Sequence, residues 1–209
     1  ISCDVFVDKL IEKYNPKIII IGYDNKFGHR GMGDYRFLIN YLKDKNIEII
    51  KFPTLKVNDV AVKSSFIKRL ISDGSVDQAR TYLKRYFCLY GKIIKGRGVG
   101  RTIGFPTANL KMLDEKQIIP KVGVYYVNFI VEQDVYKGVC NIGNRPTFSK
   151  NDKLTIETHI VNFEGKEVYN KLVKIEFIKY IRSEKKFSNK SDLINQIEKD
   201  VNVLQEIRS

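Results

Sequence analysis

A glycine-rich segment at residues 95–109 has the residue types of a phosphate-binding loop. Its sequence is Lys-Gly-Arg-Gly-Val-Gly-Arg-Thr-Ile-Gly-Phe-Pro-Thr-Ala-Asn. Glycines let backbone N–H groups approach a ligand closely, and successive backbone amides can cradle phosphates. Two arginines would add positive charge beside a polyphosphate. The candidate phosphate-binding residues are Gly96, Arg97, Gly98, Gly100, Arg101 and Gly104. A flexible hairpin with incidental charges is the alternative interpretation.

This segment matches neither of the two common nucleotide-binding motifs. It lacks the Gly-Lys-Ser/Thr ending of a Walker loop. It leads into a strand pattern and not into a helix, which excludes a dinucleotide-binding fingerprint.

Thr107 and Asn109 end the segment two residues apart. In an extended chain, residues at this spacing point to the same side, so a hydroxyl and an amide oxygen would converge. Hard oxygen ligands suit Mg²⁺, which also binds nucleotide phosphates. The pair therefore indicates a magnesium site, although Thr and Asn also occur together in ordinary turns.

The sequence Leu-Thr-Ile-Glu-Thr-His-Ile at residues 154–160 predicts a strand with one apolar and one polar face. Glu157 lies in the middle of the polar face, which is a rigid place for a general base. His159 lies on the same face as a candidate ligand or base. The alternative is a solvent-facing glutamate on an antiparallel strand.

Residues 141–148, Asn-Ile-Gly-Asn-Arg-Pro-Thr-Phe, predict a turn around Arg145. This arginine would either bind an anion or brace the turn.

The elements that position these residues change in type near residue 85. Upstream, residues 17–22 and 47–52 are short apolar runs typical of buried strands. Helical patterns alternate with them at residues 5–14, 34–42, 64–72 and 76–84. Strand–helix–strand at this spacing predicts a parallel α/β layer.

Downstream, short strands separated by Gly and Pro turns predict a closed barrel or sandwich. The predicted strands are residues 87–94, 123–131, 137–142, 154–161 and 173–180. Residues 188–207 predict one amphipathic helix with Ser188 as its N-cap. We expect two domains, residues 1–83 and 84–209.

The composition bounds the class of protein. The chain has 209 residues, is 43% hydrophobic and carries a net charge of +13. The apolar content argues against disorder, and no run approaches the eighteen apolar residues of a membrane-spanning helix. The charge favours an anionic partner, whereas the scattered lysines favour a merely solvated basic surface. Cys3, Cys88 and Cys140 form no C-x-x-C pair, so we expect a reducing cytoplasm.

Several ordered motifs from Tyr86 to the C-terminus resemble riboflavin kinases. The matching segments are residues 104–109, 123–125, 138–143, 145–148 and 157–159, then Tyr169, Ile181-Arg182, Glu184 and Phe187. The resemblance implies a small closed antiparallel barrel with a C-terminal helix. It also implies transfer of the γ-phosphoryl group of ATP to the 5′-hydroxyl of riboflavin, giving FMN.

The same resemblance implies roles for individual residues. Glu157 would accept the proton of the ribityl hydroxyl, and Thr107 and Asn109 would hold Mg²⁺ and the ATP phosphates. The glycine-rich segment would cover the phosphates. Flavin would lie between the barrel and the segment that leads into the last helix. Its candidate contacts are Phe105, Arg145 and Arg182.

The first eighty residues resemble the second half of the FMN adenylyltransferase module of bacterial FAD synthetases. The resemblance rests on residues 22–28 with Gly33-Asp34, and on residues 63–68, where two lysines replace the usual Ser and Arg. The candidate residues are Gly22, Asp24, Phe27, Gly28, Ser64, Ser65 and Lys68. The module's opening strand and its H-x-G-H motif do not occur in this sequence.

We therefore expect a truncated nucleotidyltransferase-type α/β layer followed by a riboflavin-kinase barrel. The start at Ile1, midway through an α/β unit, suggests a fragment of a bifunctional enzyme, and a protein that naturally lacks the first part of the module is the alternative. A severed parallel layer would expose strand edges and apolar surface, so we expect instability or self-association there.

Two other classes of function stay open as alternatives. One is a flavin- or nucleotide-binding fragment without catalysis, against which the intact Thr107, Asn109 and Glu157 argue. The other is a basic nucleic-acid-binding module. The barrel has no aromatic-rich RNA-binding signature and the basic residues form no stripe, so we expect neither nucleic acid nor membrane as a partner.

Overall fold

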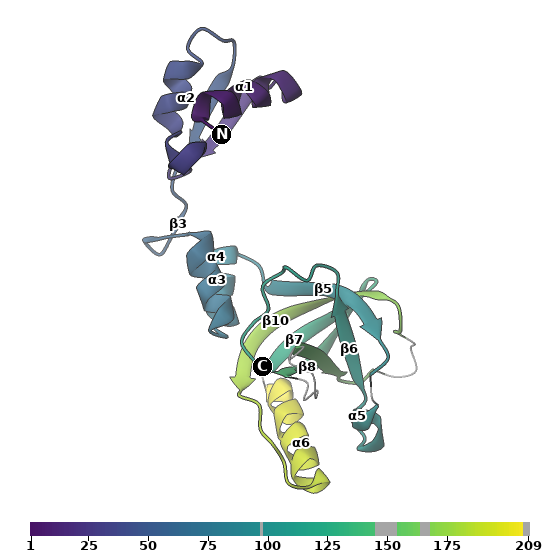
Figure 1. The fold of residues 1–209 in the computed structure, drawn as a ribbon. Helices are drawn as coiled ribbons and strands as arrows, with labels where there is room; N and C mark the ends of the chain where they lie inside the picture. Colours follow the sequence, from purple (N-terminus) through teal and green to yellow (C-terminus); the bar gives the residue numbers. More distant parts are fainter. Residues whose placement is uncertain (97, 145–153, 164–167, 207–209) are drawn as a thin grey trace. The chain divides into compact units, whose positions relative to one another are not determined.

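A computed structural model describes residues 1–96, 98–144, 154–163 and 168–206 of the chain (Figure 1). Packing divides the chain into two compact units, Ile1–Val62 and Lys63–Ser209. Each unit has its own hydrophobic core. No helix within the described ranges is long and apolar enough to cross a membrane.

The first unit is built on a two-stranded parallel sheet, which confirms the predicted α/β layer. Ile18 pairs with Glu48 at the start of the register, and Gly22 pairs with Phe52 at its end. The elements are α1 (Cys3–Tyr14), β1 (Ile18–Gly22), η1 (His29–Gly31), α2 (Tyr35–Tyr41) and β2 (Glu48–Phe52). The Asp34 carboxylate accepts a hydrogen bond from the backbone N–H of Phe37 at 3.0 Å. This cap explains why α2 begins at Tyr35.

The two faces of this sheet differ in what covers them. Ile21 is buried in a cluster with Val7 of α1 and Leu38 of α2. On the other face of the sheet, four large apolar residues are exposed within the part of the chain that the structure describes. Their exposed fractions are 51% for Ile18, 66% for Ile20, 37% for Ile50 and 59% for Phe52. One face of the parallel layer is therefore apolar and open.

A short hairpin that the sequence patterns do not predict ends the first unit. Its strands are β3 (Lys56–Val57) and β4 (Val60–Ala61). Asn58 and Asp59 connect them with positive φ angles of 51° and 60°. Two consecutive positive φ angles are typical of a type I′ turn, which Asn and Asp tolerate.

Two helices, α3 (Ser64–Ser72) and α4 (Val76–Leu83), pack with the barrel of the second unit. Leu70, Ile71, Val76 and Ala79 are buried in the same cluster as the barrel core. Packing therefore separates the units between Val62 and Lys63, whereas the domain boundary expected from sequence lies at residue 83. The domain boundary at residue 83 stays a prediction. The boundary between Val62 and Lys63 describes how the chain packs.

The second unit contains a closed antiparallel barrel, as predicted, and the described residues form it with six strands, one more than the five strands expected from the sequence. The strands follow one another in the order β10-β5-β6-β9-β8-β7. They are β5 (Phe87–Ile94), β6 (Thr107–Met112), β7 (Gly123–Val131), β8 (Asp134–Asn144), β9 (Leu154–Ile160) and β10 (Leu172–Arg182). Tyr125, Phe129 and Phe177 are fully buried in the interior, so the barrel is filled by its own side chains.

Alternation along β9 separates the barrel core from the outer surface. Ile156, Thr158 and Ile160 are buried, whereas Glu157 and His159 between them are only partly buried. Thr158 lies against the thiol of Cys140, and burial raises the pKa of that thiol to about 12. The polar face that the sequence predicted is therefore the outer face of the barrel.

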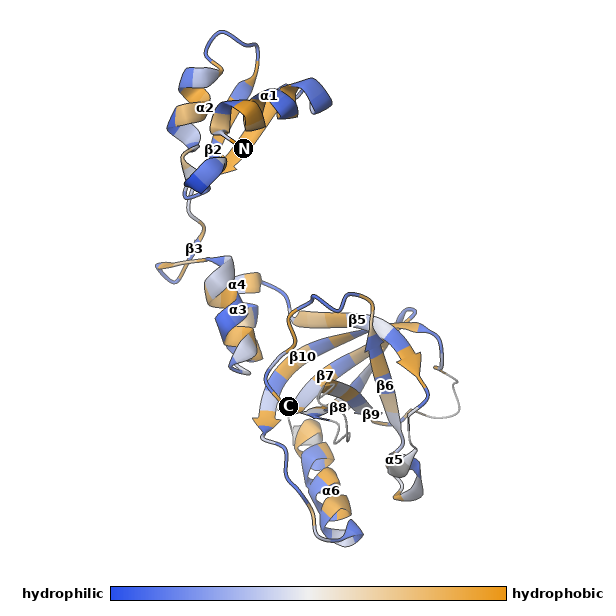
Figure 2. Cartoon of the chain, in the orientation of Figure 1, coloured by the Kyte–Doolittle hydropathy of each residue, from blue (hydrophilic) through white to orange (hydrophobic). Residues whose placement is uncertain are grey.

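Helix α6 (Lys190–Glu206) packs on the outside of the barrel. Leu204 is buried there with Val124, Tyr126 and Val139 of the strands. Apolar and polar residues alternate along α6 in Figure 2, as expected for an amphipathic helix with one buried stripe.

The predicted N-cap at Ser188 is wrong, because Asn189 caps α6. The Asn189 side-chain oxygen accepts from the backbone N–H of Asp192 at 2.8 Å, and its amide donates to the Asp192 carboxylate at 2.9 Å. The cap therefore lies one residue later than predicted, and the helix begins at Lys190.

Candidate active site

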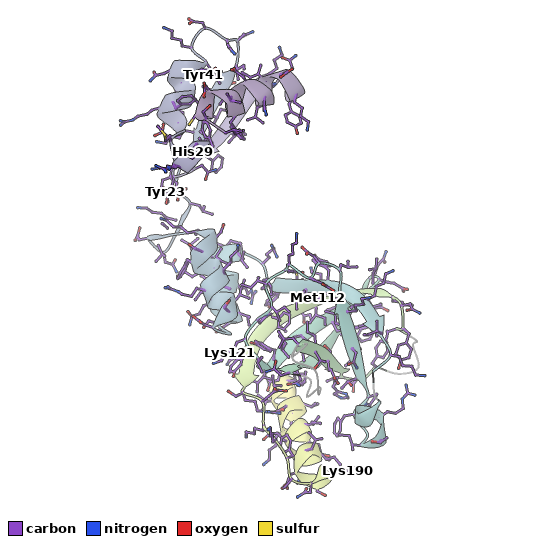
Figure 3. All side chains as sticks on the ribbon, viewed as in Figure 1. Tyr23, His29, Tyr41, Met112, Lys121 and Lys190 are labelled. Atoms are coloured by element: carbon purple, nitrogen blue, oxygen red, sulfur yellow. The ribbon has the colours of Figure 1, made fainter. Side chains whose placement is uncertain are left out.

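A cavity of about 260 Å³ lies on the outer face of the barrel, where residues of β6, β8, β9, α6 and the segment before α6 meet. Thr107, Asn141, Glu157 and His159 contribute polar groups to its wall. Its apolar wall includes Ile103, Phe105, Phe187, Leu193 and Ile197. In Figure 3, Met112 marks the end of β6 that lies away from α5, and Lys190 marks the first residue of α6.

Strand pairing brings the three candidate catalytic residues to one place. In the β6–β9 register, Asn109 lies opposite Glu157, and Thr107 lies opposite His159. The Thr107 hydroxyl donates to a carboxylate oxygen of Glu157 at 3.4 Å. Ala108 between the two β6 residues is buried in the core, so their side chains share the outer face. The two residues thus share one face of the barrel, whereas the convergence of their side-chain oxygens on one point stays a prediction.

The donor set at this place fits a hard divalent cation. Thr107 supplies a hydroxyl oxygen and Asn109 an amide oxygen, the ligand types that Mg²⁺ accepts beside phosphate oxygens and water. The described residues contain no cluster of three or more His, Cys, Asp or Glu side chains suited to a metal. The Thr107 and Asn109 oxygens stay the predicted ligands for a cation that is shared with the ATP phosphates.

The glycine-rich segment passes directly over Asn109. A Cβ atom added at Gly96 would lie 2.3 Å from the Asn109 side-chain nitrogen. Such a separation is far shorter than a van der Waals contact, so a larger residue at this position would require the Asn109 side chain to move. The backbone of Gly96 and the Asn109 side chain therefore lie close together, in the segment where the sequence predicts phosphate binding.

A four-residue helix, α5 (Val99–Thr102), interrupts the glycine-rich segment. The sequence predicts only a loop here. The backbone N–H of Phe105 donates to the Gly100 carbonyl at 2.8 Å and closes the turn. A Cβ at Gly100 would lie 2.2 Å from the Phe105 carbonyl oxygen. Gly104 has a φ of +86°, which favours glycine.

The candidate anion-binding arginines are placed differently. Arg101 is exposed on α5. Arg97 lies outside the described residues. Gly98, beside it, has a φ of +75°, and no atom of the described residues lies within 4 Å of a Cβ added there. Phosphate binding by this segment therefore stays a prediction.

His159 contacts the segment that joins the glycine-rich loop to β6. Its Nδ1 lies 3.1 Å from the backbone oxygen of Pro106. Its ring meets the Phe105 ring edge-on, with the centroids 5.1 Å apart and the planes at 73°. Alternation along the strand places His159 on the correct face, but the sequence contains no signal for these contacts.

Arg182, a candidate flavin contact, lies in the cavity wall with its guanidinium bound to α6. Its Nε lies 3.1 Å from both carboxylate oxygens of Asp200, and its Nη2 donates to one of them at 2.7 Å. Gln196 also donates to Asp200, at 2.9 Å. The Asp200 side chain is 5% exposed. Sequence reasoning missed Asp200, although an aspartate next to Val201 in the apolar stripe is a usable signal.

The predicted turn at residues 141–148 is wrong over its first half. Asn141 to Asn144 continue β8, because they pair with β9 from Glu157 to Leu154. The Asn141 amide donates to the Glu184 carboxylate at 3.1 Å. Arg145 and the rest of the predicted turn lie outside the described residues.

The candidate adenylyltransferase residues fall into both units, so each group is described within its own unit and the shared site stays a prediction. Gly22 ends β1, and Asp24 follows it in the connecting segment. Phe27 packs between Phe6 and Phe37, with ring centroids 5.4 and 5.9 Å away. A Cβ at Gly28 would lie 2.6 Å from the Cys3 sulfur. Ser64, Ser65 and Lys68 are exposed on α3 in the second unit.

Comparison with known proteins matches different families to the two ends of the chain. The riboflavin kinase family matches residues 83–208, and the FAD synthetase family matches residues 1–66. The closed barrel with its external cavity and the helix α6 thus lie within the part of the chain that the riboflavin kinase family matches. The chain belongs to the riboflavin kinase family.

Its relatives include two bacterial proteins named bifunctional riboflavin kinase/FMN adenylyltransferase. The Bacillus subtilis protein is 38% identical over 93% of this chain and 61% of its own length. The Listeria monocytogenes protein is 33% identical over 96% of this chain and 63% of its own length. The chain therefore spans less than two thirds of these relatives.

A crystal structure of a protein from Streptococcus pneumoniae, named there as a macrolide-efflux protein, has the same fold. Its TM-score is 0.84 at 30% identity, over 97% of this chain and 64% of that chain. The efflux name belongs to the Streptococcus protein alone.

Proposed function

We propose that the second unit transfers the γ-phosphoryl group of ATP to the 5′-hydroxyl of riboflavin, giving FMN and ADP. The observation that carries this proposal is the grouping of Glu157, Thr107 and Asn109 on one outer face of the barrel, inside or beside the cavity. A carboxylate that can take a proton lies there next to two oxygen ligands for a metal. Membership of the riboflavin kinase family supports the same reaction.

In this mechanism, Glu157 accepts the proton as the ribityl oxygen attacks the γ-phosphorus. The bond between that phosphorus and the bridging oxygen of ADP breaks, and ADP leaves. Strand β9 fixes the carboxylate, and the Thr107 hydroxyl donates to it. A positioned base of this kind contributes about 10²–10⁴-fold to the rate.

Thr107 and Asn109 would hold Mg²⁺ together with the ATP phosphates. The ion would neutralise charge on the transferring group, which together with positioning accounts for most catalysis of phosphoryl transfer. The glycine-rich segment lies over Asn109 and would cover the phosphates with its backbone amides.

Flavin would occupy the apolar part of the cavity between the barrel and α6. Phe105 and Phe187 offer aromatic surface there, and Leu193 and Ile197 close it from α6. Arg182 would contribute by fixing α6 through Asp200 and less by direct contact with flavin.

The test is incubation of the chain with riboflavin, ATP and Mg²⁺, followed by chromatographic separation with flavin fluorescence detection. We expect FMN, and we expect EDTA to abolish its formation. Absence of FMN from a folded sample would reject the kinase proposal in favour of a binding-only fragment. FMN formation in EDTA would reject the magnesium site.

We propose that the whole protein of which the first unit is part also adenylylates FMN to FAD. The FAD synthetase family match over residues 1–66 supports this. The H-x-G-H motif does not occur in this sequence, so the same chromatogram should contain no FAD. A clear FAD peak would show that this motif is dispensable.

We further propose that the protein works in a reducing cytoplasm, on small-molecule anions and not on nucleic acid. Cys3, Cys88 and Cys140 are all free and buried. Tight binding to generic DNA that weakens steeply with salt would contradict the second part.

Self-association is expected through the open face of the first unit's sheet. Ile20 and Phe52 present exposed apolar surface there, and unpaired parallel strand edges add to the tendency. Ile20→Lys should lower the weight-average mass in sedimentation velocity runs at high concentration. Val135→Lys is the matched control, because Val135 is 60% exposed on β8 of the barrel. An equal effect of both variants, or a monomeric parent chain, would contradict the prediction that the chain self-associates through this face.

A further inference from the structure

We propose that His159 is a positioning residue: through its Nδ1–H it holds the backbone of Pro106, and thereby fixes the start of β6 that carries Thr107. The effect of this role on catalysis rests on the proposed kinase function. The contact itself is a property of the fold.

The direction of the hydrogen bond follows from the atoms involved. The Nδ1 atom of His159 lies 3.1 Å from the carbonyl oxygen of Pro106. A carbonyl oxygen can only accept, so Nδ1 must carry the hydrogen. The Nδ1 hydrogen of His159 is thus committed to this bond.

Sheet hydrogen bonds do not hold Pro106 in place. The hydrogen bond from His159, called the tether below, takes over this task. Proline has no N–H, so it cannot donate to a ladder hydrogen bond. The β6–β9 pairing accordingly begins only at Thr107, opposite His159. The residue directly before the candidate metal ligand is therefore fixed by a side chain and not by the sheet.

The tether acts on both sides of Pro106. Upstream, the Phe105 ring packs edge-on against the His159 ring, and the backbone N–H of Phe105 donates to the Gly100 carbonyl and closes the turn. Downstream, the Thr107 hydroxyl donates to Glu157. One imidazole thus positions the end of the glycine-rich loop, a wall of the cavity and the first residue of β6.

This arrangement separates a positioning role from a role in proton transfer. The side-chain nitrogen of asparagine occupies nearly the place of the histidine Nδ1 and can donate to the same carbonyl, but asparagine cannot act as an acid or base. Alanine offers neither donor nor ring. Glutamine carries its donor one bond further out, near the place of Nε2.

The test compares FMN formation by His159→Ala, His159→Asn and His159→Gln with the parent chain, at varied ATP. Misplacement by about 1 Å can cost about 10²-fold in rate, so we expect a loss of kcat/KM of that order for the alanine variant. Asparagine should recover at least a large part of it, and glutamine little. The control is His29→Ala, an exposed histidine of the first unit, which should leave the rate unchanged.

A rate in His159→Ala equal to that of the parent chain would overturn the proposal. So would an asparagine variant as impaired as the alanine variant, since a lost acid or base would then explain the effect.

A second readout does not depend on catalysis. Amide hydrogen exchange at Phe105 should accelerate in His159→Ala and stay slow in His159→Asn, because the donor to Pro106 is lost only in the first. Unchanged exchange in His159→Ala would overturn the tether. If the parent chain makes no FMN, the kinase proposal fails while this measurement still tests the tether.

Discussion

Glu157→Gln should lower the turnover of riboflavin by about 10²-fold or more while leaving ligand binding in place. Glutamine has nearly the shape of glutamate, and its side-chain oxygen can still accept the hydrogen bond that Thr107 donates at 3.4 Å. It cannot take the proton of the ribityl hydroxyl. The loss should therefore appear in kcat, measured from FMN formation under saturating ATP.

The matched control is Glu132→Gln, the same change at an exposed glutamate whose partner is Lys171. It should leave turnover unchanged. Riboflavin and ADP titrations of both variants should give the dissociation constants of the parent chain. Near-normal turnover in Glu157→Gln would remove this residue from the base role.

Gly100→Ala should impair the use of ATP by a comparable factor, about 10²-fold in kcat/KM. The added Cβ would lie 2.2 Å from the Phe105 carbonyl oxygen, a backbone atom that cannot turn away. The turn closed by Phe105 N–H and the Gly100 carbonyl would have to open. Because that turn lies outside the barrel core, the melting temperature of the barrel should change little.

The comparison variant for this prediction is Gly98→Asn. A Cβ added at Gly98 would meet no atom of the described residues within 4 Å, and asparagine tolerates the left-handed φ of +75° there. Its effect on kcat/KM for ATP should be much smaller than that of Gly100→Ala. Equal effects of the two variants on kcat/KM would mean that a side chain at either position has the same consequence. The close contact between Gly100 and the Phe105 carbonyl would then not explain the loss.

Much of the fold could be predicted because the hydrophobic pattern is strong where the chain is buried. The predicted bounds of residues 64–72, 87–94 and 123–131 are those of α3, β5 and β7. Alternation also placed Glu157 on the correct face of β9, because a shift of one residue would bury a carboxylate in the barrel core. Local pattern and burial agree in all of these segments.

The elements that were missed depend on contacts between distant residues or on very short segments. Helix α5 has four residues with a central glycine, so no periodicity can reveal it. The Arg182–Asp200 pair and the bond from His159 to Pro106 join residues 18 and 53 positions apart. The continuation of β8 to Asn144 follows from pairing with β9 and not from its own sequence.

The alternation along β9 has a consequence for how this protein can change. Ile156, Thr158 and Ile160 determine whether the barrel is stable, whereas Glu157 and His159 face the cavity. Barrel stability therefore depends on the even-numbered positions of this strand, and the chemistry of the cavity depends on the odd-numbered ones. Evolution or an engineer can therefore retune the chemistry of this strand at small cost to folding, one residue at a time.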